Sequence, residues 1–444
     1  MVAVPKTEIS AKDIFRESHD IAAGDRSHAI KCEITRALNQ AKIEGTDLCL
    51  VCKGSRLLCG RTYCPLIKRV SAMTSPRVEE KLSQEMFGPS PPSIFVGRYG
   101  YPNVFVGPMS AIAPDNPKLM DDPSSWYGKD FDEIIQMRVN LVRSEKVEHV
   151  RSQSRAVLDS QELALSLRPT DVEIEFKKKP SFNLSFNSMT QPMGPTGELK
   201  RFEITENVHI PRAVERVVGD EIKAAEGASM LFDKGYDVYY LTKALSSGAM
   251  GLNKNKRMVP TRWSITAVDD MIAKSLMKDI RQFPTINKFR VYSNTYLDNH
   301  FEILLMPGVW EFENFEAWAP KTLWTLTQEK PVIQLEGEPH EGRTKYAEKE
   351  GGGYYAARLG VVEALHDMRR QARVVSFREV HEGYVMPVGV WEVRENVRRA
   401  MKNRPMKFAT RNEALAHIAK QLRIDFKEYM RMSSVLRQRR LSEF

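Results

Sequence analysis

Hydrophobic residues recur along the chain with two periods, and each period predicts one kind of element. Between residues 268 and 280 an apolar side chain stands at every fourth position, which predicts an amphipathic helix. Thr266, with Asp269 three residues later, has the arrangement of a capping box, so we expect this helix to begin at Thr266. Similar patterns predict helices over 131–142, over 211–227 and directly after the glycines of GGGYYAARLGVVEAL.

Other segments are rich in β-branched and aromatic residues or alternate with a period of two, which predicts strands. In SIFVGRYGYPNVFVGPM two such runs, 95–97 and 104–107, flank a Gly-Tyr-Pro-Asn turn and predict a hairpin. VEIEF and FNLSF predict a second hairpin, and FRVYSNTYLDNHFEILLM predicts a third. VSFREV and YVMPVGVW are also expected to be strands. Because helices and strands alternate without a regular βαβ repeat, we predict a mixed α/β (α+β) fold.

We expect three parts along the 444 residues, a length that exceeds one ordinary core. The proline-rich stretch 89–92 predicts a boundary. Before it lies an N-terminal helical segment with a cysteine metal knuckle, 1–88, and after it a mixed α/β body of one or two lobes, 93–430. The densest basic stretch falls in 431–444, which we expect to be a flexible C-terminal peptide tail.

The charge balance suggests a polyanionic partner. Lysine and arginine outnumber aspartate and glutamate by nine, 66 against 57, and basic side chains displace counterions from the phosphates of DNA. No apolar stretch reaches the ~20 residues that a membrane helix needs, and the start MVAVPKTEISAKD lacks the pattern of a signal peptide. We therefore expect a cytoplasmic, nucleoid-associated protein that binds DNA and no membrane.

Four of the five cysteines fall within sixteen residues, in LCLVCKGSRLLCGRTYCPL. Two close pairs joined by a short loop can surround one tetrahedral ion, because a CxxC turn brings its thiolates to the same side. Structural zinc is the first interpretation and an iron–sulfur cluster the second, since a Cys-Pro step also ends ferredoxin-type runs. Unrelated core cysteines and a redox CxxC are the remaining interpretations. The four candidate ligands are Cys49, Cys52, Cys59 and Cys64, whereas Cys32 stands apart and is expected in the core.

Two segments of the body could contact phosphate or nucleic acid. In VPTRWSITAVDD, Arg262 and Trp263 precede an expected helix, where Arg262 could pair with a phosphate and Trp263 could stack on a base. A core tryptophan and a locally paired arginine explain the same residues. In GGGYYAARLG, glycines ahead of a helix could let a phosphate approach the backbone, but the spacing is neither that of a Walker loop nor of a dinucleotide fold. The candidate contacts there are Gly351, Gly352, Gly353 and Arg358.

A third candidate site consists of acid–base residues. Glu363 and His366 are three residues apart on the expected helix, so they share one of its faces. With Glu382 of the HEGYV segment they could form an acid–base site or a second metal site. An exposed polar face is the ordinary explanation, because Arg369 and Arg370 continue it.

The last seven residues, QRRLSEF, place Gln438, Leu441 and Phe444 at intervals of three. In a 3₁₀ turn these positions share one side, so the two apolar side chains would project together and Gln438 could hydrogen-bond a partner. Peptides of this kind fold onto apolar pockets. The pattern looks like the short motif by which DNA repair and replication proteins bind the sliding clamp PCNA, although it has one terminal aromatic residue where many such motifs have two.

Together, the cysteine segment, FVGRYGYPNVFVGP, VPTRWSITAVDD, GGGYYAARLGVVEAL and QRRLSEF resemble the archaeal Nre family of DNA repair proteins over nearly the whole chain. The resemblance implies a zinc-finger segment, a role in the DNA damage response and recruitment to PCNA through the tail. It supplies no established reaction. Our first hypothesis is therefore a DNA repair factor that binds DNA and is recruited to the clamp. The alternatives are an enzyme that acts on DNA or a nucleotide, such as a nuclease, and an adaptor that does not bind DNA.

Overall fold

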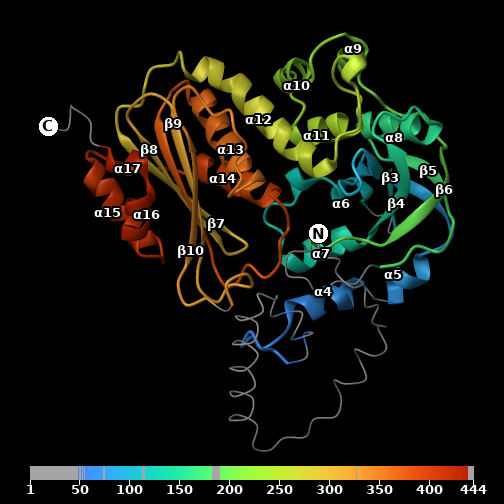
Figure 1. Cartoon of the computed structure of the whole chain (residues 1–444), viewed down its shortest axis with the longest axis horizontal. Helices are drawn as coiled ribbons and strands as arrows, with labels where there is room; N and C mark the ends of the chain where they lie inside the picture. Colours follow the sequence, from blue (N-terminus) through green and yellow to red (C-terminus); the bar gives the residue numbers. More distant parts are fainter. Residues whose placement is uncertain are drawn as a thin grey trace, which may run out of the picture.

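The computed structural model describes residues 49, 52, 54, 56–73, 76–112, 116–182, 191–326 and 328–438. They form two six-stranded mixed sheets with helices packed around them (Figure 1), which confirms the predicted mixed α/β class. The 20-residue helix α12 (Thr261–Ile280) runs between the two sheets (Figure 1). No helix in the ranges given above is long and apolar enough to cross a membrane.

The first sheet has the strand order β1-β5-β6-β4-β3-β2. Its neighbouring strands are antiparallel, except that β4 and β6 are parallel. The hairpin predicted in SIFVGRYGYPNVFVGPM is confirmed, because β2 and β3 pair with Phe95 opposite Gly107. The strands are β1 (Glu85–Ser90), β2 (Ile94–Val96), β3 (Asn103–Ala111), β4 (Leu141–His149), β5 (Thr170–Phe176) and β6 (Thr196–Ile204). The helices in this half are α4 (Pro65–Met73), α5 (Pro76–Lys81), α6 (Pro117–Met120), η1 (Pro123–Ser125), α7 (Phe131–Val139) and α8 (Arg155–Leu165).

The proline-rich stretch 89–92, where the sequence predicts a boundary, begins inside strand β1. Pro89 and Ser90 form the end of β1 and pair with β5, and the buried Ser90 hydroxyl donates a hydrogen bond to the Met109 carbonyl. A proline is tolerated here because β1 is an edge strand, where a missing N–H need not break the ladder. The expected partner strand FNLSF lies mostly outside the described residues, and β5 pairs with β1 and β6.

The second sheet has the strand order β10-β9-β11-β8-β7-β12, with β9 and β11 parallel and the other neighbours antiparallel. Helices α12 to α14 pack on one face and α15 to α17 on the other (Figure 1). The strands are β7 (Phe289–Tyr296), β8 (Asn299–Met306), β9 (Glu311–Trp318), β10 (Val332–Glu338), β11 (Arg373–Val380) and β12 (Met406–Phe408). The helices of this half and of the connection to it are α9 (Arg212–Gly219), α10 (Ala224–Asp233), α11 (Val238–Ser246), η2 (Asn253–Asn255), α13 (Gly352–Met368), α14 (Trp391–Lys402), α15 (Arg411–Gln421), α16 (Phe426–Met432) and α17 (Ser434–Arg437).

Strand β11 is buried along its whole length, because helices cover both faces of the sheet. On the face toward α16, Phe315 and Phe377 stack with ring centroids 5.4 Å apart. Tyr429 packs edge-on against both rings, at 5.0 and 5.3 Å. This continuous burial explains why VSFREV was recognisable as a strand.

Three expected elements differ in the structure. Helix α12 begins at Thr261, after Pro260, which has no side-chain cap bond; the predicted capping box at Thr266 is wrong, because that residue lies inside the helix. The expected helix 211–227 is divided into α9 and α10. YVMPVGVW is not a strand but a loop that leads into α14, where the first residue, Trp391, packs edge-on against Trp126 at 5.3 Å.

The described part of the predicted tail belongs to the second core. Val435 and Leu436 of α17 are buried. Buried Glu313 on β9 accepts hydrogen bonds from the backbone N–H groups at the start of α17 and from two serine hydroxyls there. The prediction that a flexible tail begins at residue 431 is therefore wrong. The fold continues to Gln438, and the last six residues, with Leu441 and Phe444, lie outside the described ranges.

Candidate nucleic-acid interface

Two of the motifs singled out in the sequence meet in space. The start of α12 lies against the outer edge of β2, where the backbone N–H of Val96 donates to the Thr261 hydroxyl at 3.0 Å. The rings of Tyr101 and Trp263 lie 5.3 Å apart and are tilted by 51°. Both stay in contact with solvent, with exposed fractions of 42% and 46%. Trp263 is therefore not a core residue, and the interpretation of this motif as an exposed contact is the one that the structure favours.

The turn between β2 and β3 presents a second exposed tyrosine. Gly100 has φ of +82°, and a side chain there would meet the Asn103 carbonyl at 2.8 Å, so this turn requires glycine. On one side of it Tyr99 is 75% exposed. The Arg98 guanidinium lies 4.8 Å from the centre of the Tyr99 ring and donates to its hydroxyl at 2.8 Å.

Backbone hydrogen bonds hold three separate segments together at this place. The N–H of Val150, at the end of β4, donates to the carbonyl of Pro102 in the turn at 2.9 Å. The N–H of Met258, in the loop before α12, donates to the carbonyl of Val150 at 2.8 Å. The turn, the end of β4 and the loop therefore lie side by side. We call the side chains that they expose the hairpin–helix surface: Arg98, Tyr99, Tyr101, Arg151, Lys254, Arg257, Arg262 and Trp263.

The hairpin–helix surface is basic. Five of its eight side chains are cationic and exposed, and within the described part of the chain Lys254, Arg257 and Arg262 form no ion pair. Glu148 accepts hydrogen bonds from Ser152 and Ser154 and pairs with Lys146. This arrangement produces positive potential beside exposed aromatic rings, a combination that binds nucleic acid through phosphates and bases.

The glycine run at the start of α13 is occupied by the protein itself. A side chain on Gly353 would meet a carboxylate oxygen of Glu316 at 2.9 Å. Glu350 is also buried there, and burial, followed by the charge of Glu316, raises the pKa of its carboxyl well above the usual range. A phosphate placed here would face two carboxyl groups. The glycines are needed for close packing, and the structure does not favour the predicted phosphate contact at Gly351, Gly352 and Gly353.

Arg358, the fourth predicted contact of that motif, is buried and already paired. Its guanidinium donates to Glu338 at 2.7 Å and pairs with Asp270 of α12. The rings of Tyr354 and Tyr355 lie 5.7 and 5.3 Å from it. The side chain therefore links α13 to β10 and α12 and is not available to a ligand.

The predicted acid–base residues do not converge. The Glu363 carboxylate accepts hydrogen bonds from Nε and Nη2 of Arg398, at 2.7 and 2.6 Å, whereas His366 contacts Asp279 at 3.2 Å. Glu382 pairs with Arg423 elsewhere, at 3.3 Å. Among the described residues, no group of three or more His, Cys, Asp or Glu side chains has the geometry of a metal site.

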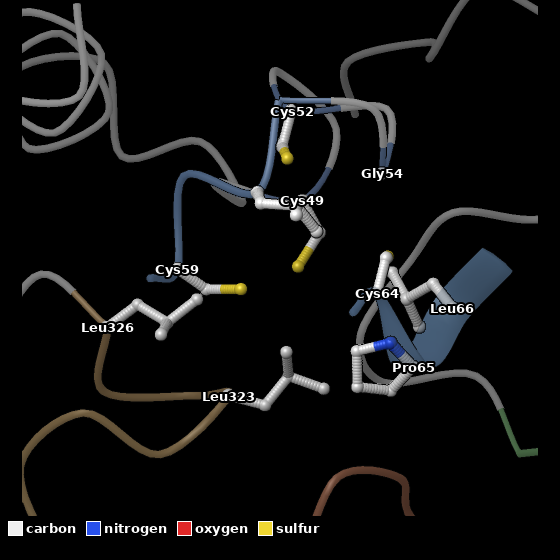
Figure 2. A pocket seen from close by; sticks show the side chains of 10 residues that line it. Cys49, Cys52, Gly54, Cys59, Cys64, Pro65, Leu66, Leu323 and Leu326 are labelled. Carbon is white, nitrogen blue, oxygen red and sulfur yellow. The ribbon is translucent and has the colours of Figure 1, made fainter. Parts of the chain in front are cut away.

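The four clustered cysteines line one small cavity. Cys49, Cys52, Cys59 and Cys64 surround a space of about 10 Å³ together with apolar side chains, including Leu323 and Leu326. Figure 2 shows the thiols of Cys49 and Cys59 pointing into this space. Burial raises the pKa of the Cys64 thiol, and the neighbouring Cys52 and Cys59 raise it further. The cysteine segment is thus folded against the loop that follows β9.

Sequence reasoning found Arg262 and Trp263 but missed their neighbours. Tyr101 was assigned only to the hairpin turn, and Tyr99, directly before that turn, was given no role. The basic run before VPTRW, which includes Lys254 and Arg257, could also have been recognised in the sequence as a candidate contact. Its contact with the turn could not be predicted, because about 160 residues separate the two segments.

Comparison with known proteins agrees with the resemblance noted in the sequence. The family model for the N-terminal region of archaeal Nre matches residues 58–325, and the model for the C-terminal region matches residues 338–444. The chain is 37% identical to DNA repair protein NreA of Archaeoglobus fulgidus over 399 residues, covering 89% of this chain and 98% of that one. It is 36% identical to DNA repair protein NreB of the same organism, covering 89% and 99%. It is 36% identical to DNA repair protein NreA of Haloferax volcanii, covering 81% and 88%. No solved structure matches the chain.

Proposed function

The chain belongs to the archaeal Nre family, and from that membership we propose that it acts in DNA repair, binds DNA through the hairpin–helix surface and is recruited to the sliding clamp PCNA by its last seven residues. Three relatives that align over most of the chain carry the name DNA repair protein. DNA binding rests on one observation. Exposed Tyr101 and Trp263 lie together among cationic side chains that form no ion pair in the described structure.

The first prediction concerns phosphate contacts. Replacing Arg257 and Arg262 with methionine is expected to weaken binding to a 20-bp duplex about ten-fold at low salt. Each phosphate contact that is lost reduces the number of counterions that the DNA releases on binding. The slope of log affinity against log salt should fall by about two. Fluorescence anisotropy over a salt series measures both quantities.

The matched control removes the same charge from another exposed site. Arg201 of β6 and Lys234, which follows α10, are both exposed. Their replacement by methionine should leave the salt slope close to that of the wild type. Equal slopes for the wild type and the Arg257–Arg262 variant would place the DNA interface elsewhere.

Clamp recruitment is supported by the position of the peptide. Gln438 is exposed and directly follows α17 on the outer face of the second sheet. Its side-chain oxygen accepts a long hydrogen bond, 3.4 Å, from Arg373, so little would be lost if a partner replaced that bond. The anchoring of α17 by Glu313 fixes where the peptide leaves the fold.

The second prediction tests this recruitment. Deleting the last seven residues, or replacing both Leu441 and Phe444 with alanine, should abolish co-elution with PCNA in size-exclusion chromatography, because the apolar side chains supply most of the contact with a pocket. Ser442→Ala, which changes a position between them, is the control and should co-elute normally. Normal co-elution of the truncated chain would rule out the tail as the clamp-binding element.

We also propose that the four cysteines hold one structural metal ion, with zinc the best fit to four thiolates. The small cavity that the four cysteines line together with leucines supports this, although the four side chains as placed do not have the geometry of a metal site. A four-thiolate site leaves no position for water, so the ion would stabilise the fold. The docking of this segment on the loop after β9 would then depend on the metal.

A further inference from the structure

We infer that the hairpin–helix surface binds unpaired bases of single-stranded DNA, with a base stacked on the ring of Trp263. This inference rests on the proposed DNA-binding function and narrows it to one class of DNA. It commits to a nucleic-acid partner and not to a protein. The grounds are the exposure of the rings, their rigidity and the charge that surrounds them.

The exposure of Trp263 is unusual within this protein. Of the six tryptophans, all of which are described, it is the most exposed, at 46%. Trp126 and Trp310, by contrast, are almost completely buried. Leaving large rings in water forfeits the gain from burying them, and exposed apolar groups that cluster mark a binding surface. Tyr99 and Tyr101 extend the same cluster.

The ring of Trp263 is held in place before any ligand arrives. Tyr101 packs against it at 5.3 Å. The preceding Thr261 is fixed by the N–H of Val96 and by a 3.1 Å contact with the Ser246 hydroxyl, and the following Ser264 is buried. A rigid ring loses little conformational entropy on binding, which favours stacking.

The shape of the surface favours unpaired bases over a duplex. Inside duplex DNA both faces of each base are covered by neighbouring pairs, so an exposed aromatic ring cannot stack on them and could reach only the outer face of a terminal pair. An unpaired base offers a free face, and stacking tolerates any base. The phosphates on either side of such a base would lie within reach of Arg262 and Arg257, which have no ionic partner in the described structure.

The charge of the hairpin–helix surface favours nucleic acid over protein as its partner. Aromatic and arginine side chains also form protein interfaces, but these are depleted in surplus charge at their centre. Here five cations surround three rings, and Glu148, near the end of β4, is bound by two serines and Lys146. A polyanion neutralises this excess of positive charge, and a neutral protein surface does not.

The test compares the full-length chain with its Trp263→Leu variant, using a labelled 20-nucleotide dT strand and a 20-bp duplex in fluorescence anisotropy. The wild type should prefer the single strand. Trp263→Leu should lose about ten-fold in affinity for the single strand and little for the duplex, because stacking contributes only to unpaired bases. Trp263→Phe, which keeps a ring, should retain most of the affinity.

The control variant is Phe87→Leu. Phe87 is 71% exposed on β1, at the opposite edge of the same sheet, and its replacement should leave both affinities unchanged. Photo-crosslinking of the wild type to a bromodeoxyuridine strand gives a readout that needs no variant. Mass spectrometry should locate the crosslink at Trp263, Tyr101 or Tyr99.

The outcomes separate the two hypotheses. Duplex binding without a preference for the single strand, or equal losses for both DNAs in Trp263→Leu, overturns the stacking inference and leaves the proposed DNA binding intact. Binding to neither DNA overturns both. Crosslinks confined to other parts of the chain overturn the inference. It is also overturned if this surface binds a protein and not DNA.

Discussion

Replacing Arg378 with methionine is expected to lower the free energy of unfolding by about 3–5 kcal/mol. Arg378 lies inside the second sheet, where it pairs with Glu316, lies 3.6 Å from Glu392 and donates two hydrogen bonds to Asn299. Removing the cation leaves two buried carboxyl groups without a counter-charge, which costs more than the pair itself contributes. Urea unfolding followed by tryptophan fluorescence measures the loss.

The deficit should grow as the pH rises. Burial already raises the pKa of Glu392 to about 7, although Arg378 acts against this. Without Arg378, which lowers it, the pKa of Glu392 should rise further. The folded state of the variant then holds protons that the unfolded chain, with glutamate pKa near 4.3, has released. Stability is therefore lost as the pH rises above about 5, and the variant should be closer to the wild type at pH 5 than at pH 8.

Two further variants test this explanation. Arg378→Met combined with Glu316→Gln and Glu392→Gln should recover most of the stability, because no charge then remains buried alone. Arg201→Met, which breaks an exposed pair with Glu203, should leave the unfolding midpoint unchanged. A triple variant as unstable as the single one would show that packing, and not charge, makes Arg378 important.

The cysteine segment leads to the second large effect. The purified protein is expected to contain about one equivalent of zinc, and Cys59→Ser with Cys64→Ser should reduce it to none, because two of four thiolates are lost. Elemental analysis measures the metal. An iron–sulfur cluster would instead give iron and visible absorbance.

Loss of the metal should also release the segment from the body. Leu323 and Leu326 pack against the cysteines, so the variant should be cut by protease in this region faster than the wild type. Cys32→Ser is the control, since Cys32 is expected not to be a ligand, and it should keep the metal. A wild-type protein without any metal would contradict the prediction.

Local patterns were sufficient to predict part of the fold. The β2–β3 hairpin has strands and a Gly-Tyr-Pro-Asn turn that are adjacent in sequence, so the pattern contains all the information needed. β11 was predicted because its valines and its phenylalanine favour a strand, although the arginines and the glutamate between them are also buried. YVMPVGVW is also rich in valine and aromatic residues, but Pro387 and Gly389 interrupt it, and it forms a loop that packs around Trp391.

The site was harder to predict because its contacts join distant segments. Trp263 and Tyr101 meet only after α12 docks on β2, and no local rule specifies that docking. Arg358 was expected to bind phosphate because it follows three glycines. It pairs with Glu338 and Asp270 instead, and both partners are set by how the helices pack on the second sheet.

The anchoring of α17 by Glu313 also limits the distance between the folded body and any partner that binds the C-terminal peptide. Gln438 comes directly after the last residue of α17, so no linker separates the folded body from the peptide. Leu441 is three residues further on and can lie at most about 10 Å away. A ring-shaped clamp that binds this peptide would therefore hold the folded body within a short distance of its own surface. The bound protein would reach only the DNA next to the ring, and only in a few orientations. It would move along a chromosome only as far as the ring moves.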